Sequence, residues 1–494
     1  MKRLFWLALF LWLAVNLLTL TGYPGVWVDE ILSADAGIHL AQGKGFVSAG
    51  WFNQPSTELW ASYPPLYALL LAGWLKLFCI TAFVVRVFGL GLIAVSLLMI
   101  LLCLKRLEDH TTSLTIILAL AVCEPLAFLE RAGRPDSVSV FLLCATALVF
   151  VERTWRWREI VLFVLGLLAV PAALQYAAFV VILGALLQIW FRAFTRREIM
   201  IWISGAATGA AVLAGVYAGH HVLRIFLEST VASTHSSAGR LLQSLLLKNG
   251  ATAFVPSDIL TAPLRDYASP VLIVSGIAAW FLAKRSKHSL AQKLAGFGVA
   301  CAIVIPIAIQ LLGKYPIYYA YMGTVPATVA ILAAWRRLGH RTVTAVILLL
   351  LLMGGAGRFW WKAWNQGTQT VYESLSHVTE EDTVVADYPT YYSLLGHVQE
   401  LFAVGYAGGK VMPHFPPDQA ARVNKIFVRD SLFTTVAKRV GGQWQRISEV
   451  IVLRHESLTD EIVIDDDTRK PVVERIGIYA RTGGNKNLSA SGAR

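Results

Sequence analysis

The sequence predicts an all-α membrane domain of about eleven transmembrane helices, with further helices at the outer membrane surface and a small C-terminal α/β domain outside the membrane. Composition is the first reason: 56% of the 494 residues are hydrophobic and 15% are charged, whereas about 25% are charged in an ordinary soluble domain. The second reason is that apolar runs recur over the first three-quarters of the chain. Crossing the hydrocarbon core takes roughly 20 such residues, so the bilayer is the solvent for most of this chain.

Basic residues indicate how the spans are oriented. The formal net charge of +12 comes largely from Lys and Arg in short clusters between apolar runs, where they face the cytoplasm and meet anionic lipid. Membrane lipids are therefore expected partners, and nucleic acid is not. The five cysteines lie in or beside apolar segments without metal-ligand spacing. We predict no cofactor and no protein metal site, and the sequence leaves open whether a divalent metal takes part.

The first predicted helix, near residues 5–21, is retained in the membrane because the following YPGVW lacks the small residues of a signal-peptide cleavage site. Two basic residues precede it and place the N-terminus in the cytoplasm. Residues 22–62 then lie outside. The apolar stretch that begins at Pro64 is short for a span and contains Lys76, so we expect a helix that lies on the membrane surface.

The remaining spans alternate so that each cytoplasmic end carries Lys or Arg, and a long loop over residues 219–269 lies outside. Together with the first helix they form a transmembrane domain over residues 1–360. We predict them near residues 83–104, 113–130, 137–151, 159–172, 176–191, 199–218, 270–283, 291–312, 317–334 and 342–357.

The C-terminal region changes from apolar runs to alternating strand and helix patterns, which predicts an α/β domain over residues 365–484 on the outer side. A helical stretch is expected around Tyr391 to Phe402. Residues 485–494 are rich in Gly and Ser and are predicted to be disordered. The predicted strands are TVVAD (383–387), KIFVRD (425–430), EVIVLRH (449–455) and RIGIYAR (475–481).

Two acidic residues follow the first predicted helix. Asp29 and Glu30 open an amphipathic segment that carries Ile31, Ala34 and Ile38 on one side. Carboxylates at a helix start complement the helix dipole, which is one interpretation. A carboxylate outside the membrane can also serve as a general base, and the spacing alone leaves both interpretations open.

The motif GRPDS contains Arg134 and Asp136 at the outer end of a predicted hairpin. Taken alone it is typical of a polar turn in which Pro135 sets the geometry. Farther along, GKYPIYYAYMG places Lys314, Tyr315 and Tyr319 at the membrane boundary. Aromatic residues at that depth anchor a helix, and a lysine beside phenol hydroxyls can also hold a phosphate.

Three further residues are candidates for the acceptor site or a polar cavity. Glu124 lies within an apolar run, where a charge in lipid is costly, so we expect it to face a polar cavity. Tyr63 precedes the surface helix, and His220 begins the long external loop, where solvation at the surface is the simpler interpretation.

The set of motifs resembles the glycosyltransferases of the C-type membrane fold (GT-C), specifically the bacterial relatives of the protein O-mannosyltransferases and of the lipid A aminoarabinose transferases. The resemblance rests on the order of an Asp-Glu pair, a PPLY helix, an Arg-Pro-Asp turn, a late Lys/Tyr cluster and a C-terminal extramembrane domain. It implies that Asp29 is the catalytic base and Asp136 a second acid. The His-Pro-Pro or Lys-Pro element of that family is Tyr63-Pro64-Pro65 here, which assigns the donor phosphate to Lys314 or Arg134.

The implied activity is transfer of a sugar from a polyprenyl-phosphate donor to a hydroxyl of a glycan, lipid or protein acceptor on the outer side of the inner (plasma) membrane. Glu30 would orient the acceptor or tune Asp29, and Tyr315 and Tyr319 would help to hold the phosphate. The alternative is a transporter or lipid flippase without transferase activity. Such proteins concentrate ionisable residues near the middle of the membrane, whereas the acids here gather on one face.

Overall fold

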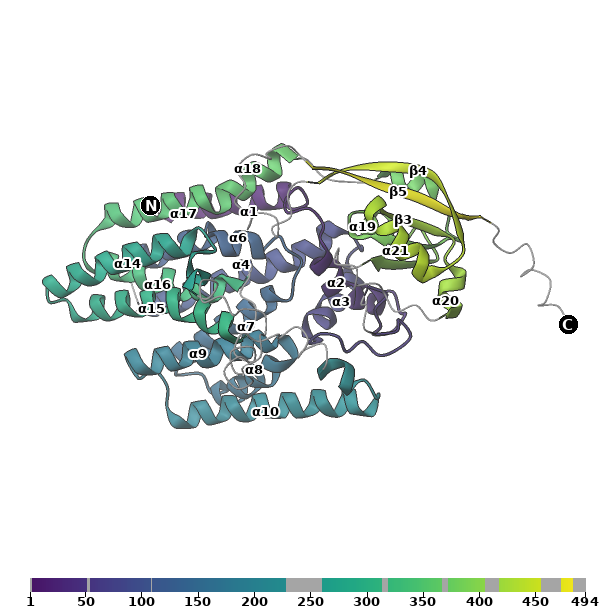
Figure 1. Ribbon diagram of the computed structural model, residues 1–494. Coiled ribbons are helices and arrows are strands. Elements are labelled where there is room, and N and C mark those ends of the chain that lie inside the picture. Colours follow the sequence, from purple (N-terminus) through teal and green to yellow (C-terminus); the bar gives the residue numbers. More distant parts are fainter. Residues whose placement is uncertain are drawn as a thin grey trace, which may run out of the picture. The chain divides into compact units, whose positions relative to one another are not determined.

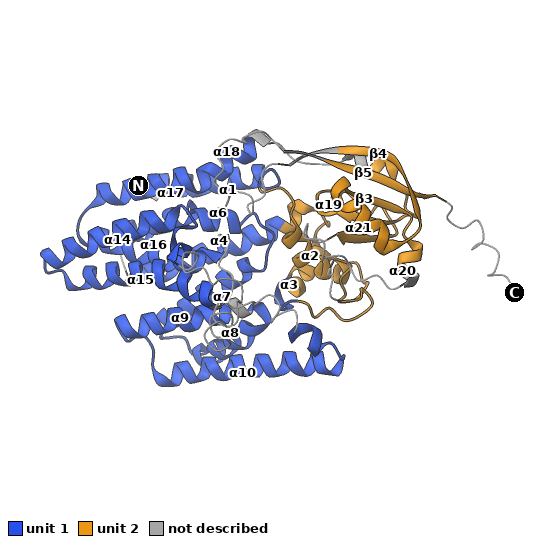
Figure 2. Ribbon diagram, in the orientation of Figure 1, with its two compact units in different colours: residues 1–23, 63–67, 86–365 blue, residues 24–62, 68–85, 366–494 orange. Residues whose placement is uncertain are grey.

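A computed structural model describes residues 2–50, 54–107, 109–227, 260–312, 319–366, 372–404, 417–454 and 472–482. The chain forms two compact units, coloured separately in Figure 2. Unit 1 comprises residues 1–23, 63–67 and 86–365, and unit 2 comprises residues 24–62, 68–85 and 366–494. Unit 2 thus combines the segment after the first helix with the C-terminal region.

Unit 1 is helical throughout its described residues, as Figure 1 shows. Helices α14, α15 and α16 pack against one another, and α8 packs along α10. The elements that lie wholly or mainly in this unit are α1 (Lys2–Thr19), α4 (Ala82–Leu107), α5 (His110–Ala121), α6 (Glu124–Leu129), α7 (Asp136–Val151), α8 (Arg158–Ala172), α9 (Leu174–Phe191), α10 (Arg196–Gly219), η1 (Ala262–Leu264), α14 (Ala268–Arg285), α15 (Ser289–Leu312), α16 (Tyr321–Arg337), α17 (Arg341–Gly354) and α18 (Ala356–Gln366).

Five helical segments of the described chain are long and apolar enough to cross a membrane: Ala82–Arg106, Arg196–Gly219, Ala268–Arg285, Ser289–Leu311 and Arg341–Trp364. Shorter apolar helices occupy other predicted spans, among them Arg3–Thr19 and Asp136–Val151. The expected class, a mostly helical membrane domain with a small C-terminal sheet, is confirmed. The number of spans, about eleven, stays a prediction.

Two predicted spans are interrupted. The single helix expected near residues 113–130 is wrong: α5 ends at Ala121, and α6 starts at Glu124 with Pro125 in its first turn. Proline lacks the N–H that would continue the earlier helix. The span expected near residues 342–357 also divides, because Gly355 separates α17 from α18. A Cβ at Gly355 would lie 2.4 Å from the Val122 carbonyl oxygen, so a side chain there would prevent the two breaks from packing together.

Helices α8 and α10 approach closely because glycines face the opposing backbone. A Cβ on Gly205 would lie 2.1 Å from the Phe163 carbonyl oxygen, and one on Gly209 would lie 2.1 Å from that of Leu167. On α8, a Cβ on Gly166 would lie 2.2 Å from the Trp202 carbonyl oxygen. Small residues that allow backbones to touch are a common basis of helix packing in membranes.

Backbone carbonyl groups at the C-terminal end of α1 accept hydrogen bonds from two buried arginines. Arg131 donates to the carbonyl and hydroxyl oxygens of Thr19 and to Asn16 Oδ1, at 2.6 to 3.1 Å. Arg86 donates to the Leu20 carbonyl at 2.9 Å. The last carbonyls of a helix have no partners within the helix, so these guanidinium groups anchor the end of α1 to α4 and to the loop after α6.

Unit 2 is built on a five-stranded sheet of order β2-β1-β3-β5-β4 (Figure 1). Strand β1 runs parallel to both β2 and β3, whereas β5 is antiparallel to β3 and to β4. Its elements are α2 (Val28–Ala41), most of α3 (Leu66–Leu77), η3 (Tyr372–His377), β1 (Thr383–Asp387), α19 (Tyr388–Leu394), β2 (Glu400–Val404), α20 (Pro417–Arg422), β3 (Lys425–Arg429), α21 (Asp430–Val440), β4 (Gln443–Arg454) and β5 (Val472–Thr482).

The expected strand 383–387 coincides with β1, and the strand 475–481 lies within β5. The strand expected at 425–430 is one residue longer than β3, because Asp430 begins α21, and the strand expected at 449–455 falls in β4 up to Arg454, where the described residues end. The helical stretch expected from Tyr391 to Phe402 is wrong in its second half, because residues 400–404 form β2. Strand β2 pairs in register with β1, from Thr383 opposite Glu400 to Asp387 opposite Val404. This long-range pairing overrides the local preference of a short segment.

Candidate active site

Asp29 and Glu30 lie in the first turn of α2, in unit 2. The N-cap residue, Trp27, makes no side-chain capping bond, so the two carboxylates are the groups that complement the helix dipole. Asp29 is partly exposed, whereas Glu30 is fully buried. Of the two, Asp29 is therefore the one whose carboxylate can reach a substrate.

Asp35 is a carboxylate of α2 that we did not predict as important, and hydrogen-bond donors surround it. Its Oδ2 accepts hydrogen bonds from Ser48 Oγ at 2.6 Å, from the Ala49 amide at 2.7 Å and from the Gly50 amide at 3.1 Å. Its Oδ1 accepts from the hydroxyl of Tyr391 in α19. A signal was present in the sequence, because Asp35 follows Ile31 by four residues and so lies on the apolar face of the helix.

The segment after α2 also contacts the sheet. The Ala403 amide, on edge strand β2, donates to the Ala49 carbonyl at 3.3 Å, and Ser56 Oγ donates to Gln419 at 2.9 Å. Ala49 is part of the apolar cluster formed by residues of β1, β2, β3, α21 and β5. The loop after the helix that carries the predicted base is therefore integrated into the C-terminal domain.

In unit 1, Arg134 and Asp136 form a buried ion pair. Arg134 Nε donates to Asp136 Oδ2 at 2.8 Å, and each side chain is only 6% exposed. Asp136 begins α7, and Ser137 Oγ donates to the Arg134 carbonyl at 3.0 Å. The motif is thus no solvated surface turn, since both charges lie inside the protein.

Aromatic residues surround this ion pair. The Arg134 guanidinium lies 6.0 Å from the centre of the Tyr319 ring, within the range of a cation–π contact. Tyr321 is buried at the start of α16 and lies close enough to Asp136 and Tyr63 to interact with them electrostatically. Arg134, Asp136, Tyr319 and Tyr63 are thereby brought into one region of unit 1.

Glu124 contacts the starts of two helices. One carboxylate oxygen accepts from the Tyr267 amide, immediately before α14, and the other lies 3.5 Å from Arg358 of α18. The Ala356 amide donates to the Val122 carbonyl at 3.1 Å nearby. Glu124 therefore joins the break between α5 and α6 to the start of α14 and to α18, which is a structural function for its buried charge.

Asp266 is a second buried acid beside Glu124, and we did not predict it. It lies just before α14, where its Oδ1 accepts from the Ser269 amide at 2.7 Å. Burial raises the pKa of Asp266 to about 6, although the hydrogen bonds from Ser269 act in the opposite direction. An apolar surrounding disfavours the charged form of a carboxyl group, so this residue titrates near neutral pH.

The remaining predicted residues do not join either group in the described parts of the chain. His220 follows α10 and is exposed, as expected for a solvated position. Lys314 and Tyr315 lie outside the described residues. Within the described ranges, no group of three or more His, Cys, Asp or Glu residues could hold a metal ion.

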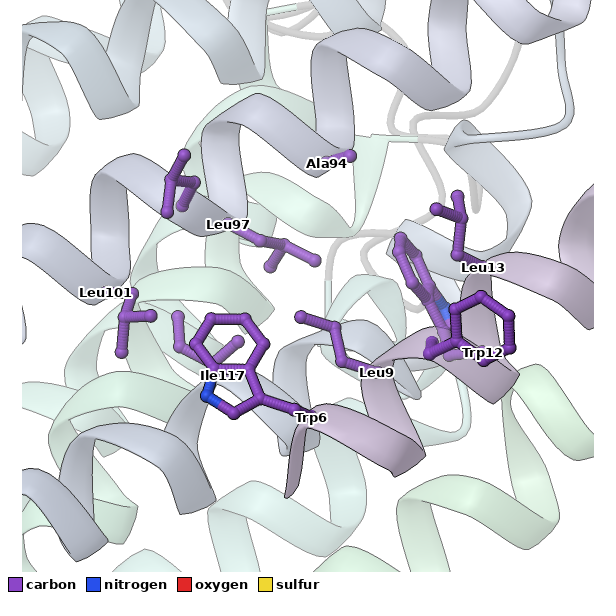
Figure 3. Close-up of a pocket in the computed structure, with 10 residues that line it drawn as sticks. Trp6, Leu9, Trp12, Leu13, Ala94, Leu97, Leu101 and Ile117 are labelled. Atoms are coloured by element: carbon purple, nitrogen blue, oxygen red, sulfur yellow. The ribbon is translucent and has the colours of Figure 1, made fainter. Parts of the chain in front are cut away.

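An apolar pocket of about 230 Å³ lies between α1 and α4, with Ile117 of α5 at its wall (Figure 3). Trp6, Leu9 and Trp12 project into it from α1, opposite Leu97 and Leu101 of α4. Its lining is hydrocarbon and aromatic, which suits a lipid chain more than a polar sugar.

Comparison with known proteins gives a fold and no sequence family. No family model matches the sequence, and no curated protein matches it. Among solved structures, the chain is similar to ArnT from Cupriavidus metallidurans bound to undecaprenyl phosphate, with a TM-score of 0.56 and 10% identity. That match covers 97% of this chain and 98% of ArnT. A weaker likeness, with a TM-score of 0.40 and 13% identity, is to the arabinofuranosyltransferase AftD from Mycobacteria, of which 40% is covered.

ArnT is a C-type membrane glycosyltransferase. The resemblance to that fold expected from the order of the sequence motifs is therefore confirmed, and the ArnT likeness extends over almost the whole chain. At 10% identity the likeness establishes the fold alone.

Proposed function

We propose that this protein is a multi-pass inner-membrane glycosyltransferase that moves a sugar from a polyprenyl-phosphate donor to a hydroxyl of a glycan, lipid or protein acceptor. The observation that supports the proposal most is the fold shared with ArnT over nearly the full length of both chains, in a structure that holds undecaprenyl phosphate. Since one fold can host several functions, the roles of individual residues carry the rest of the argument.

The reaction requires a base and a stabilised leaving group. The acceptor oxygen attacks the anomeric carbon of the donor sugar, and its proton passes to the Asp29 carboxylate. The bond between the anomeric carbon and the phosphate oxygen breaks, and its electron pair leaves with the polyprenyl phosphate. Because the donor is already activated, this exchange requires no redox cofactor.

The two acids in the first turn of α2 have different roles because they differ in exposure. Asp29 is partly exposed and acts as the base, whereas Glu30 is buried and supports Asp29 from within the first turn of the helix. Asp136 is bound to Arg134, so its role is to hold that guanidinium in place. A phosphate at Arg134 would compete with this carboxylate, and we therefore assign the donor phosphate first to Lys314, with Tyr315 and Tyr319 beside it.

The proposed orientation places the N-terminus in the cytoplasm and residues 22–62, 219–269 and 365–494 on the outer side, because basic clusters then face inward. Cysteine labelling tests it at two exposed positions, Glu58 and Lys287. Because the native Cys79 is exposed, both variants are made in a Cys79→Ala background. A membrane-impermeant maleimide should label Glu58→Cys in intact cells and Lys287→Cys only after lysis. The reverse pattern would contradict the orientation.

The activity test uses purified protein in nanodiscs with a panel of synthetic undecaprenyl-phosphate pentoses and hexoses. Mass spectrometry measures release of undecaprenyl phosphate in the presence of membrane extract as a source of acceptors. Asp29→Asn keeps the shape of the side chain and removes its charge, so release should fall by a factor on the order of 10² to 10⁴. Glu58→Gln, an exposed acid of the same external segment, is the matched control and should match the wild-type rate.

Two results would oppose the proposal. Turnover of Asp29→Asn at near the wild-type rate would refute the base assignment and make Asp136 the next residue to test. Movement of the lipid across the bilayer of proteoliposomes, without cleavage of any donor in the panel, would favour the transporter instead.

A further inference from the structure

The C-terminal domain reaches the helix that carries the proposed base through one side chain, Tyr391. This tyrosine lies in α19, directly after β1, and is fully buried. Its hydroxyl donates to Asp35 Oδ1, and Asp35 is itself fully buried in the middle of α2. A residue 356 positions away in the sequence therefore completes the hydrogen bonding of an acid in the first external segment.

We propose that Tyr391 is a positioning residue: through Asp35 it holds α2, and with it Asp29, in the geometry needed for transfer. The proposal rests on the function assigned to Asp29 above. It gives the C-terminal domain a role in the reaction, since the domain supplies the donor that fixes the catalytic helix.

The contacts of Asp35 show why one phenol has this effect. The Ser48 hydroxyl and the Ala49 and Gly50 amides all bind Oδ2, so the loop after α2 occupies one oxygen. Within the described residues, the Tyr391 hydroxyl donates to the other oxygen, Oδ1, and His39 Nδ1 lies 3.5 Å from that oxygen. A carboxylate buried away from water must find its partners within the protein, so loss of the phenol leaves that oxygen poorly satisfied.

Tyr391 is held firmly itself. Asp387 accepts from the Tyr388 amide at 2.9 Å at the start of α19, and the same carboxylate pairs with Arg429 of β3. The position of Tyr391 is thus set by the carboxyl ends of β1 and β3. Burial, and then the nearby Asp35 carboxylate, raise the pKa of Tyr391 well above its ordinary value, so the phenol stays protonated and remains a donor.

Asp35 transmits this constraint along α2. Asp29 lies six residues before Asp35 in the same helix, which is less than two turns. A helix of this length moves as a rigid body, so rotation or displacement at Asp35 displaces Asp29 as well. Misplacement of a catalytic group by about 1 Å can reduce the rate about a hundredfold.

The test compares Tyr391→Phe with a matched control in the full-length protein in nanodiscs. Tyr479→Phe removes a similar bond in the same domain, because the Tyr479 hydroxyl donates to Asp430 at 2.8 Å, a residue of α21. Hydrogen exchange of the α2 amides is measured by mass spectrometry, together with release of undecaprenyl phosphate from the donor that the wild-type protein cleaves.

In Tyr391→Phe, we expect exchange in α2 to accelerate about tenfold or more, the effect of losing one hydrogen bond to a charged group. The kcat should fall about tenfold or more while the KM for the donor is unchanged, because α2 positions the base and does not bind the prenyl phosphate. Tyr479→Phe should change neither quantity. In an Asp29→Asn background, Tyr391→Phe should cause no further loss of rate, since its effect passes through Asp29.

Three outcomes would overturn the inference: wild-type exchange and kcat in Tyr391→Phe, equal losses in both tyrosine variants, or a further loss of rate in the Asp29→Asn background. A different outcome identifies failure of the proposed function. If Asp29→Asn itself transfers sugar normally, the base assignment is wrong. Hydrogen exchange of the α2 amides then still decides whether Tyr391 holds this helix.

Discussion

Replacing Asp266 by asparagine should stabilise the protein at alkaline pH and not at acidic pH. Folding raises the pKa of this carboxyl from an ordinary value of 3.8 to about 6, so the folded protein binds a proton more tightly than the unfolded chain does. The favourable contribution of the protonated form is fully present below the unfolded pKa and is lost as the pH rises through about 6. Asparagine mimics the protonated form at every pH.

The magnitude follows from the change in pKa. One pKa unit corresponds to about 1.4 kcal/mol, so the rise to about 6 corresponds to a gain of about 3 kcal/mol for Asp266→Asn at pH 8. The gain should decrease to below about 1 kcal/mol at pH 4. The amide can still accept the hydrogen bond that the Ser269 amide makes to Oδ1 at 2.7 Å, so the cap of α14 is kept.

Thermal unfolding of the detergent-solubilised protein, followed by tryptophan fluorescence at one scan rate, measures this effect for variant and wild type at each pH. Asp382→Asn is a control for which we expect the opposite change in stability. Burial of Asp382 acts to raise the pKa of its carboxyl group. Hydrogen bonding from Lys425 at 2.7 Å nevertheless holds this pKa below its ordinary value. This variant should lose stability at pH 8, and the loss should shrink as the pH falls below about 4. A pH-independent gain in Asp266→Asn, or a loss at pH 8, would refute the reasoning.

Three other outcomes are expected. Gly205→Ala should destabilise the packing of α8 on α10 by about 1–3 kcal/mol, because its Cβ would meet a backbone oxygen. Gly215 lies in the same helix with open space around it, so Gly215→Ala should leave the midpoint of thermal unfolding unchanged. Asp136→Ala should cost about 3–5 kcal/mol because it leaves the Arg134 charge buried without this partner, and an Arg134→Met/Asp136→Leu double variant with a smaller loss in chemical denaturation would support that cause. A fragment covering 366–494 should gain chemical stability when residues 24–62 are co-expressed with it, and equal stability with and without residues 24–62 would contradict the packing of unit 2.

Much of the fold could be read from local patterns. Apolar length predicts the membrane helices, and short strand-like runs between turn residues predict strands such as TVVAD, which is β1. The two interruptions were missed for different reasons. Pro125 was visible in the sequence and marks the start of α6, whereas the break at Gly355 depends on its contact with the Val122 carbonyl, which no local pattern reveals.

The candidate site was also predicted only in part, because local sequence shows residue types and does not show their burial or their distant partners. The charged pair Arg134 and Asp136 could be named from the motif, but its burial, with the Tyr319 ring beside Arg134, is visible only in the structure. Asp35 and Asp266 were missed because each is one acid among ordinary neighbours in the sequence. Their importance lies in partners that are distant along the chain, or in burial.

By itself the sequence determined the class of this protein, a helical membrane domain with a C-terminal sheet domain. Hydropathy and periodicity are properties of short segments, and they favour a helix or a strand whatever the rest of the chain does. The tertiary structure decided that residues 24–62 pack with the C-terminal region, and that Tyr391 binds Asp35. A buried carboxylate must be satisfied by whatever donors the fold brings to it, and a donor 356 residues away is selected by packing of the whole unit and by no feature of the chain around Asp35.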